Sequence, residues 1–170
     1  HQADVPADKH YDVLVNQHVE MVNLNRSHPS ILMWSMGNES LKFKEYFKQA
    51  SETVKQLDPT RPRIFSQWGP DADEGTLEIT NHHYPGPEGP DKYRHYKRPV
   101  TFDEFCHLNA YNRLELAADP GLRNMWGKLL DAMWNDMYHS QGVLGGAIWV
   151  GIDDTFFLPG EKAVGYGTWG

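Results

Sequence analysis

Two glutamates stand out as residues whose type and position could perform chemistry. Glu39 follows the short apolar run at residues 31–36, and Glu104 lies near the end of a second such run, residues 99–105. A carboxylate beside apolar sequence is costly unless it has partners or a function. Two carboxylates that face one cleft can cleave a glycosidic bond, because one protonates the leaving oxygen and the other attacks the anomeric carbon or activates water.

Each glutamate also has a purely structural interpretation, which spacing alone leaves open. Glu39 could be an acidic residue in the first turn of a helix, where the helix dipole favours it. Glu104 could be a solvated charge at a strand end. The position of both residues at the ends of predicted strands favours the functional interpretation over the structural one.

Other kinds of chemistry receive less support from the sequence. His82 and His83 are adjacent, so in a strand their side chains would point to opposite faces and would not share a metal ion. His107 lies three residues after Glu104, but no metal-binding motif joins them. Cys106 has no nucleophile signature around it, and a buried inert thiol is the usual case. We therefore expect no metal site and no catalytic cysteine in this chain.

The aromatic residues divide between a helix and strand ends. Trp126 and Trp134 lie on a helical pattern, which predicts that both belong to the core. Trp68 and Trp149 end predicted strands, where an indole face could stack on the C–H face of a sugar.

The pattern of apolar residues predicts three helices and five strands. The helices are expected at residues 12–26, 41–57 and 122–137, and the strands at residues 31–36, 63–68, 77–83, 99–105 and 144–152. Strands that alternate with helices indicate an α/β fold with a parallel sheet. Polar residues gather just after the strands, where parallel α/β folds place their chemistry. Five strands are too few for an eight-stranded barrel, so a barrel would lack about three leading strands.

The composition and charge of the chain limit the kinds of partner that it is expected to bind. The 170 residues carry a net charge of −7 and are 39% apolar. Basic runs never exceed two residues and apolar runs are short, so neither a nucleic acid nor a membrane is an expected partner. A single cysteine excludes an intrachain disulfide, and nothing indicates a compartment. The chain begins at His1 and ends on the segment Gly165–Gly170, which indicates a piece of a longer protein.

The residues from Arg26 to Ser40 resemble a signature of glycoside hydrolase family 2, the β-galactosidase and β-glucuronidase family. The matching elements are His-Pro-Ser, Trp-Ser and Gly-Asn-Glu-Ser. Residues 101–105 resemble the family's nucleophile strand, and residues 145–149 its last barrel strand. The resemblance implies that residues 1–170 are the C-terminal half of a catalytic (β/α)8 TIM barrel, about strands 4 to 8.

The resemblance also implies a role for each matching residue. Glu39 would be the general acid/base and Glu104 the nucleophile. Four further residues would bind substrate: Asn38 near the sugar 2-hydroxyl, Tyr84 near the nucleophile, His107 as in the β-galactosidase branch, and Trp149 lining the pocket. His82 and His83 have no secure counterpart.

The implied mechanism is retaining hydrolysis by double displacement, which requires carboxyl groups about 5–5.5 Å apart. The favoured substrate is a terminal β-galactoside, which an exo-acting enzyme would cleave; β-glucuronidase, β-mannosidase or another family specificity stays open. Most ligands of the magnesium seen in some members would lie before His1, so this segment is expected to hold no cofactor, while the full-length protein could bind magnesium. Its remaining partners would be the other barrel half and accessory β-domains.

Two other interpretations differ from this one in class. Half a barrel exposes sheet edges, so the chain could be a non-catalytic carbohydrate-binding or structural remnant. A barrel glycosidase of another clan would also place Asn-Glu at the end of its fourth strand, but the His-Pro-Ser element argues against it.

Overall fold

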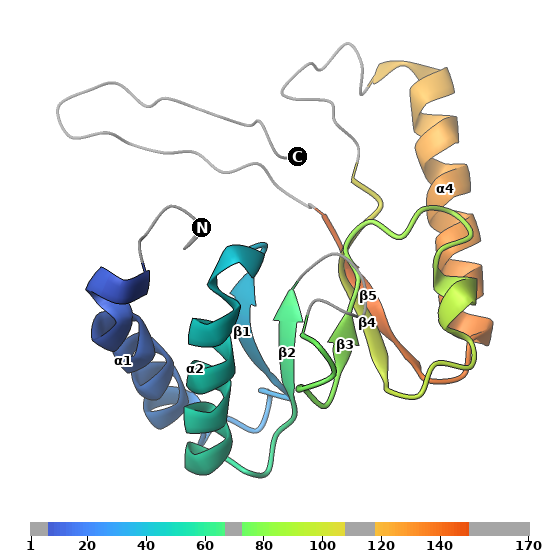
Figure 1. Ribbon diagram of the computed structural model, residues 1–170. Coiled ribbons are helices and arrows are strands. Elements are labelled where there is room, and N and C mark those ends of the chain that lie inside the picture. Colours follow the sequence, from blue (N-terminus) through green and yellow to red (C-terminus); the bar gives the residue numbers. More distant parts are fainter. Residues whose placement is uncertain (1–6, 67–72, 108–117, 150–170) are drawn as a thin grey trace, which may run out of the picture. The chain divides into compact units, whose positions relative to one another are not determined.

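The computed structural model describes residues 7–66, 73–107 and 118–149 (Figure 1). The chain forms two compact units, residues 1–82 and residues 83–170. Among the described residues, no helix is both long and apolar enough to cross a membrane.

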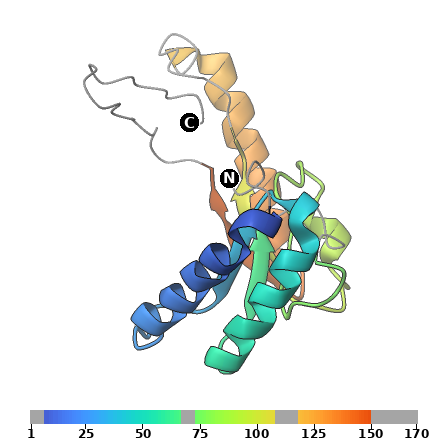
Figure 2. The same cartoon turned by 60° about the vertical axis from the view of Figure 1, so that its left-hand side comes forward.

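The first unit packs two helices against a pair of parallel strands. Its elements are α1 (Ala7–Asn25), β1 (Trp34–Asn38), a 3-10 turn (Leu41–Phe43), α2 (Lys44–Leu57), β2 (Arg63–Ser66) and β3 (Thr80–Asn81). Strand β1 pairs in parallel with β2. Helices α1 and α2 pack against each other beside these strands, as both views show (Figures 1 and 2).

Helix α2 follows the predicted 3.6-residue period closely. Its buried residues include Phe47, Ala50 and Val54, which face the core of the first unit. The Phe47 ring packs on Phe65 of β2 with ring centroids 4.8 Å apart. The helix ends at Leu57, just before an Asp-Pro pair, because proline disfavours helical backbone in the residue before it.

An extra residue in β1 shapes the backbone just before Glu39. Between Ser35 and Asn38 the strand advances three residues while its partner β2 advances two, from Ile64 to Ser66. Gly37 lies inside this irregular stretch, and a Cβ there would come within 2.6 Å of the Phe47 ring. Only glycine therefore fits without moving the aromatic core.

Two predicted strands of the first unit are shorter than expected. Strand β1 begins at Trp34, and Ser35 is exposed, so the prediction of a strand over residues 31–36 buried on both faces was wrong in extent and burial. Only residues 80–81 of the predicted strand 77–83 are extended pairs. The Glu78 carboxylate accepts the Arg63 backbone N–H at 3.0 Å, a donor that a regular strand ladder would have used.

The second unit also contains a parallel strand pair with a helix. Its elements are a 3-10 turn (Pro90–Tyr93), β4 (Val100–Phe105), α4 (Pro120–His139) and β5 (Val143–Ile148). Strand β4 pairs in parallel with β5, and α4 lies alongside them (Figures 1 and 2). The core gathers Tyr93, Val100, Phe102, Phe105, Cys106, Met133 and Met137. The parallel pairing in both units agrees with the predicted α/β class and with part of a barrel.

Helix α4 begins and packs as its sequence predicts, with one exception. The Asp119 side chain caps it by accepting the Leu122 backbone N–H at 2.9 Å. Trp126 packs against the core, and its indole N–H donates to the Cys106 carbonyl at 2.8 Å. Trp134 is 56% exposed, so its assignment to the core was wrong. It lies one residue after Met133, which takes the inward position of that turn.

The close approach of β4 and β5 depends on Gly146. A Cβ at this position would lie 2.1 Å from the Phe102 carbonyl oxygen, which is backbone and cannot rotate away. We expect Gly146→Ala to lower the free energy of unfolding by about 1–3 kcal/mol, seen as a lower urea midpoint. Gly127→Ala in α4 is the matched control, because a Cβ there meets nothing within 4 Å. That change should stabilise by about 0.5–1 kcal/mol; equal midpoints for the two variants would contradict the expectation.

Candidate active site

Strand β4 presents Asp103 and Glu104 next to each other at its carboxyl end. Between Phe102 and Phe105 this strand advances three residues while β5 advances two, from Gly146 to Ile148. An extra residue of this kind interrupts the regular alternation of side chains and re-aims them. The Asp103 side chain is 27% exposed and the Glu104 side chain is 13% exposed, so most of the surface of both side chains is shielded from solvent.

Tyr84 holds Glu104 through both its backbone and its side chain. The Tyr84 hydroxyl donates to Glu104 Oε2 at 2.5 Å, and the Tyr84 backbone N–H donates to the Glu104 carbonyl at 2.8 Å. Tyr84 adopts φ +47°, a left-handed conformation that is unusual outside glycine. A residue keeps such a conformation only where neighbouring contacts enforce it. Here the two hydrogen bonds to Glu104 are such contacts.

His107 and Trp149 lie beside the same end of β4. The His107 ring packs edge-on against the Tyr84 ring, with centroids 5.9 Å apart. The half-buried Trp149 directly follows β5, and its backbone N–H donates to the Phe105 carbonyl at 3.0 Å. The second unit therefore brings together four of the six predicted site residues, namely Tyr84, Glu104, His107 and Trp149.

Cys106 turns the chain between Glu104 and His107. It has φ +59°, and its carbonyl is held by the Trp126 indole N–H from α4. Burial raises the pKa of the Cys106 thiol, so the thiol stays protonated near neutral pH. A protonated thiol is a poor nucleophile, and the expectation of no catalytic cysteine stays a prediction.

Asn38 and Glu39 end β1 in the first unit. Glu39 is half-buried with φ +46°, and its backbone N–H donates to the Ser66 carbonyl at 2.9 Å. Among the residues that the structure describes, the buried Asn38 Oδ1 has no hydrogen-bond partner. A buried acceptor left in this state costs about 1–3 kcal/mol, so Asn38 is ready to accept a hydrogen bond from a ligand hydroxyl.

Each predicted carboxylate thus follows or lies in an irregular parallel strand, one in each unit. The separation between the Glu39 and Glu104 carboxyl groups stays a prediction, because the two glutamates belong to different units. Trp68 lies outside the described residues. The expectation of no metal in this segment also stays a prediction.

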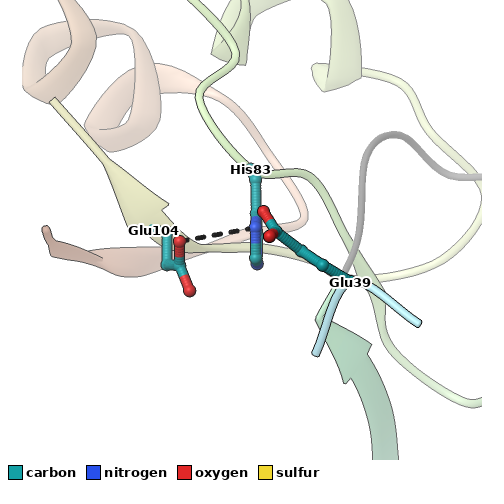
Figure 3. A group of neighbouring side chains, drawn as sticks. All are labelled: Glu39, His83 and Glu104. Atoms are coloured by element: carbon teal, nitrogen blue, oxygen red, sulfur yellow. Dashed lines mark ion pairs between the residues drawn. The ribbon is translucent and has the colours of Figure 1, made fainter. Parts of the chain in front are cut away.

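Two residues of this region, His83 and Asp103, received no role in the sequence analysis. His83 is fully buried, and its Nε2 lies 3.0 Å from Asp103 Oδ1. Its Nδ1 lies 3.6 Å from Glu104 Oε2 (Figure 3). Strand alternation did not apply to it, because β3 ends at Asn81. The signal that could have found it is the acidic pair Asp103-Glu104, since adjacent half-buried carboxylates favour a cationic partner.

Residues 2–142 match the family described as "Glycosyl hydrolases family 2, TIM barrel domain". A β-glucuronidase of Paenibacillus borealis is 31% identical over 121 aligned residues, which cover 56% of this chain and 20% of that protein. A β-glucuronidase of Sus scrofa is 44% identical over 50 residues, covering 27% of this chain and 8% of that protein. The alignments thus reach at most about a fifth of the length of these two relatives.

Solved structures share the fold over most of the chain. The β-D-glucuronidase of Dictyoglomus thermophilum superimposes with a TM-score of 0.67 at 20% identity, covering 94% of this chain and 32% of that one. A family 2 β-galacturonidase from Eisenbergiella tayi gives a TM-score of 0.65 at 18% identity, covering 82% of this chain and 29% of that one. At these identities the likeness establishes the fold alone, which is part of a TIM barrel.

Proposed function

Because this chain belongs to glycoside hydrolase family 2, as part of its TIM-barrel domain, we propose that it carries the acid/base and the nucleophile of a retaining exo-β-glycosidase. One observation carries the proposal. Glu104 ends a parallel strand, is largely buried, and accepts the Tyr84 hydroxyl at 2.5 Å. The hydrogen bond fixes the orientation of the carboxylate, which an attacking nucleophile requires.

In the first step Glu104 attacks the anomeric carbon. Its carboxylate oxygen forms a bond to C1 while the bond from C1 to the leaving oxygen breaks. Glu39, protonated, gives its proton to that oxygen, so the aglycone leaves as a neutral alcohol. The product of this step is a glycosyl ester on Glu104.

In the second step the sugar is released. Glu39, now ionised, takes a proton from a water molecule, whose oxygen attacks C1 as the ester bond to Glu104 breaks. Two inversions restore the original anomeric configuration. Asn38, with its buried and unsatisfied Oδ1, would accept a hydrogen bond from a sugar hydroxyl in both steps. His107 and Trp149 would line the sugar site.

Two lines of support favour different sugars as the substrate. The resemblance of His107 favours a β-galactoside. The similar proteins from Paenibacillus borealis and Sus scrofa are β-glucuronidases, and a protein of similar structure is a β-galacturonidase. These similarities favour a β-hexuronide as the substrate. We propose that a hexuronide and a galactoside are the two substrates to compare first.

We also propose that the segment works within a longer protein. The chain spans only 29–32% of two solved family structures that it matches, and the remaining barrel strands and accessory β-domains would come from the parent chain. The resemblance places most magnesium ligands before His1, so no step above passes through a metal.

The test uses the parent protein and a panel of aryl β-glycosides. Turnover of the β-galactoside and the β-glucuronide is compared, and NMR of the first-formed sugar reports its anomeric configuration. Retention with a single preferred sugar supports the proposal. Turnover that survives both Glu39→Ala and Glu104→Ala would exclude it, and an inverted product would exclude double displacement.

Tyr84→Phe tests the hydrogen bond to the nucleophile. The change removes one donor to a carboxylate, worth about 1.5–3 kcal/mol, so kcat/KM should fall about 10- to 100-fold. Steady-state kinetics measures the change. Tyr138→Phe, on an exposed residue of α4, is the matched control and should leave the rates unaltered. Equal kinetics for the Tyr84 variant and the wild type would show that the hydroxyl does not act on Glu104.

A further inference from the structure

A buried histidine contacts both carboxylates at the end of β4, and neither the resemblance nor the comparisons give it a role. His83 has 0% of its side chain exposed. Its Nε2 lies 3.0 Å from Asp103 Oδ1, and its Nδ1 lies 3.6 Å from Glu104 Oε2. Figure 3 shows the ring beside the Glu104 carboxylate, joined to it by the ion-pair line.

The contact with both acids depends on the local irregularity of β4. In a regular strand Asp103 and Glu104 would point to opposite faces. The extra residue between Phe102 and Phe105 breaks that alternation, and one imidazole reaches a carboxylate oxygen of each residue. Irregularities of this kind commonly lie next to active sites, where they re-aim a side chain.

The two ring nitrogens face groups that can only accept protons. An ionised carboxylate has no donor, and a neutral imidazole has one donor and one lone pair. Both contacts are ion-pair contacts, because the Nδ1–Oε2 distance of 3.6 Å is longer than a hydrogen bond and no hydrogen bond joins Nε2 to Asp103. A charged ring attracts both carboxylates, whereas a neutral ring attracts them only weakly. A buried charge is tolerated when it is paired, and here the ring contacts two carboxylates.

The charge balance connects this histidine to catalysis. Two neighbouring carboxylates repel each other, and the nucleophile must keep a fixed orientation to attack. A cation that contacts both Asp103 and Glu104 offsets this repulsion. Tyr84 donates to the same oxygen, Glu104 Oε2, that faces the ring, so the two residues hold the carboxylate from two sides.

We propose that His83 is a positioning residue, a buried imidazolium that pairs with Asp103 and Glu104 and keeps the nucleophile oriented. The catalytic part of this inference rests on the proposed function, whereas the protonation state of the ring does not. Asp103 is also part of this arrangement, because its carboxylate holds the His83 ring in place.

The first experiment reads the ring directly. The parent protein is labelled with ¹⁵N-histidine, and the His83 signals are assigned by their loss in His83→Gln. At pH 8, where an exposed histidine is largely neutral, we expect both His83 nitrogens to resonate as protonated. His139, which is exposed on α4, is the reference signal. A His83 ring with one unprotonated nitrogen at this pH overturns the proposal, whether or not any variant folds.

The second experiment measures kinetics. His83→Gln should lower kcat about 10- to 100-fold, as expected for a lost partner of a charged group, while KM changes by less than about twofold. Asp103→Asn should lower kcat less, and the double variant should be no worse than His83→Gln alone, since both act through one contact. His139→Gln is the matched control.

The outcomes separate this inference from the function on which it rests. Full activity in Glu104→Ala would exclude the proposed function itself. Full activity in His83→Gln, together with an inactive Glu104→Ala, would exclude the positioning role and leave the glycosidase proposal intact. A loss in His83→Gln that appears only in KM would also exclude it, because a positioned nucleophile acts on kcat.

Discussion

Glu104→Ala should abolish turnover of aryl β-glycosides by the parent protein, lowering kcat by a factor on the order of 10⁴ to 10⁶, as for other enzymes that lose a nucleophile or its base. The reason is that the proposed glycosyl ester forms on the Glu104 carboxylate. Glu104 is the carboxylate that both Tyr84 and His83 face, and its removal leaves their side chains without the group they hold.

Azide distinguishes a lost nucleophile from a lost fold. In Glu104→Ala a small anion can occupy the vacated space and attack C1 from the side of the missing carboxylate. One displacement gives a single inversion, so the expected product is the α-glycosyl azide. Glu88→Ala, on an exposed residue of the same unit, is the control and should keep full activity. A Glu104→Ala variant with wild-type kcat would exclude the nucleophile assignment.

Glu39→Ala should produce a loss that depends on the leaving group. General acid catalysis contributes about 10²- to 10⁴-fold, and a leaving group that departs without a proton does not need it. We therefore expect a large fall in kcat/KM with alkyl glycosides and a small one with dinitrophenyl glycosides. The measurement is a plot of log kcat/KM against the pKa of the leaving alcohol, which should become steep in the variant.

Azide again identifies the role, with the opposite stereochemistry. In Glu39→Ala the glycosyl ester on Glu104 still forms, and azide replaces the water that Glu39 would have activated. Two displacements give retention, so the product should be the β-glycosyl azide. Glu45→Ala on α2, whose side chain is 87% exposed, is the control. An equal loss with all leaving groups would contradict the acid/base role.

The helices show how much of the structure the local sequence pattern predicts. Helix α2 and helix α4 lie within a few residues of their predicted ranges, because an amphipathic period is a property of consecutive residues. Trp134 marks the limit of that approach. It shares its helix with Trp126, and only the packing of α4 against β4 and β5 decides that Trp126 turns inward while Trp134 is 56% exposed.

The sequence by itself determined the α/β class, the family and the positions of Glu39 and Glu104 at strand ends, since apolar runs and the residues that follow them are local. Only the tertiary structure decided that β1 and β4 each hold an extra residue, and that His83 contacts two carboxylates, 20 and 21 positions further along the chain. The physical reason is that register and charge pairing arise between segments. The irregularity of a strand depends on the strand with which it pairs. The charge state proposed for the buried histidine depends on the carboxylates that it contacts.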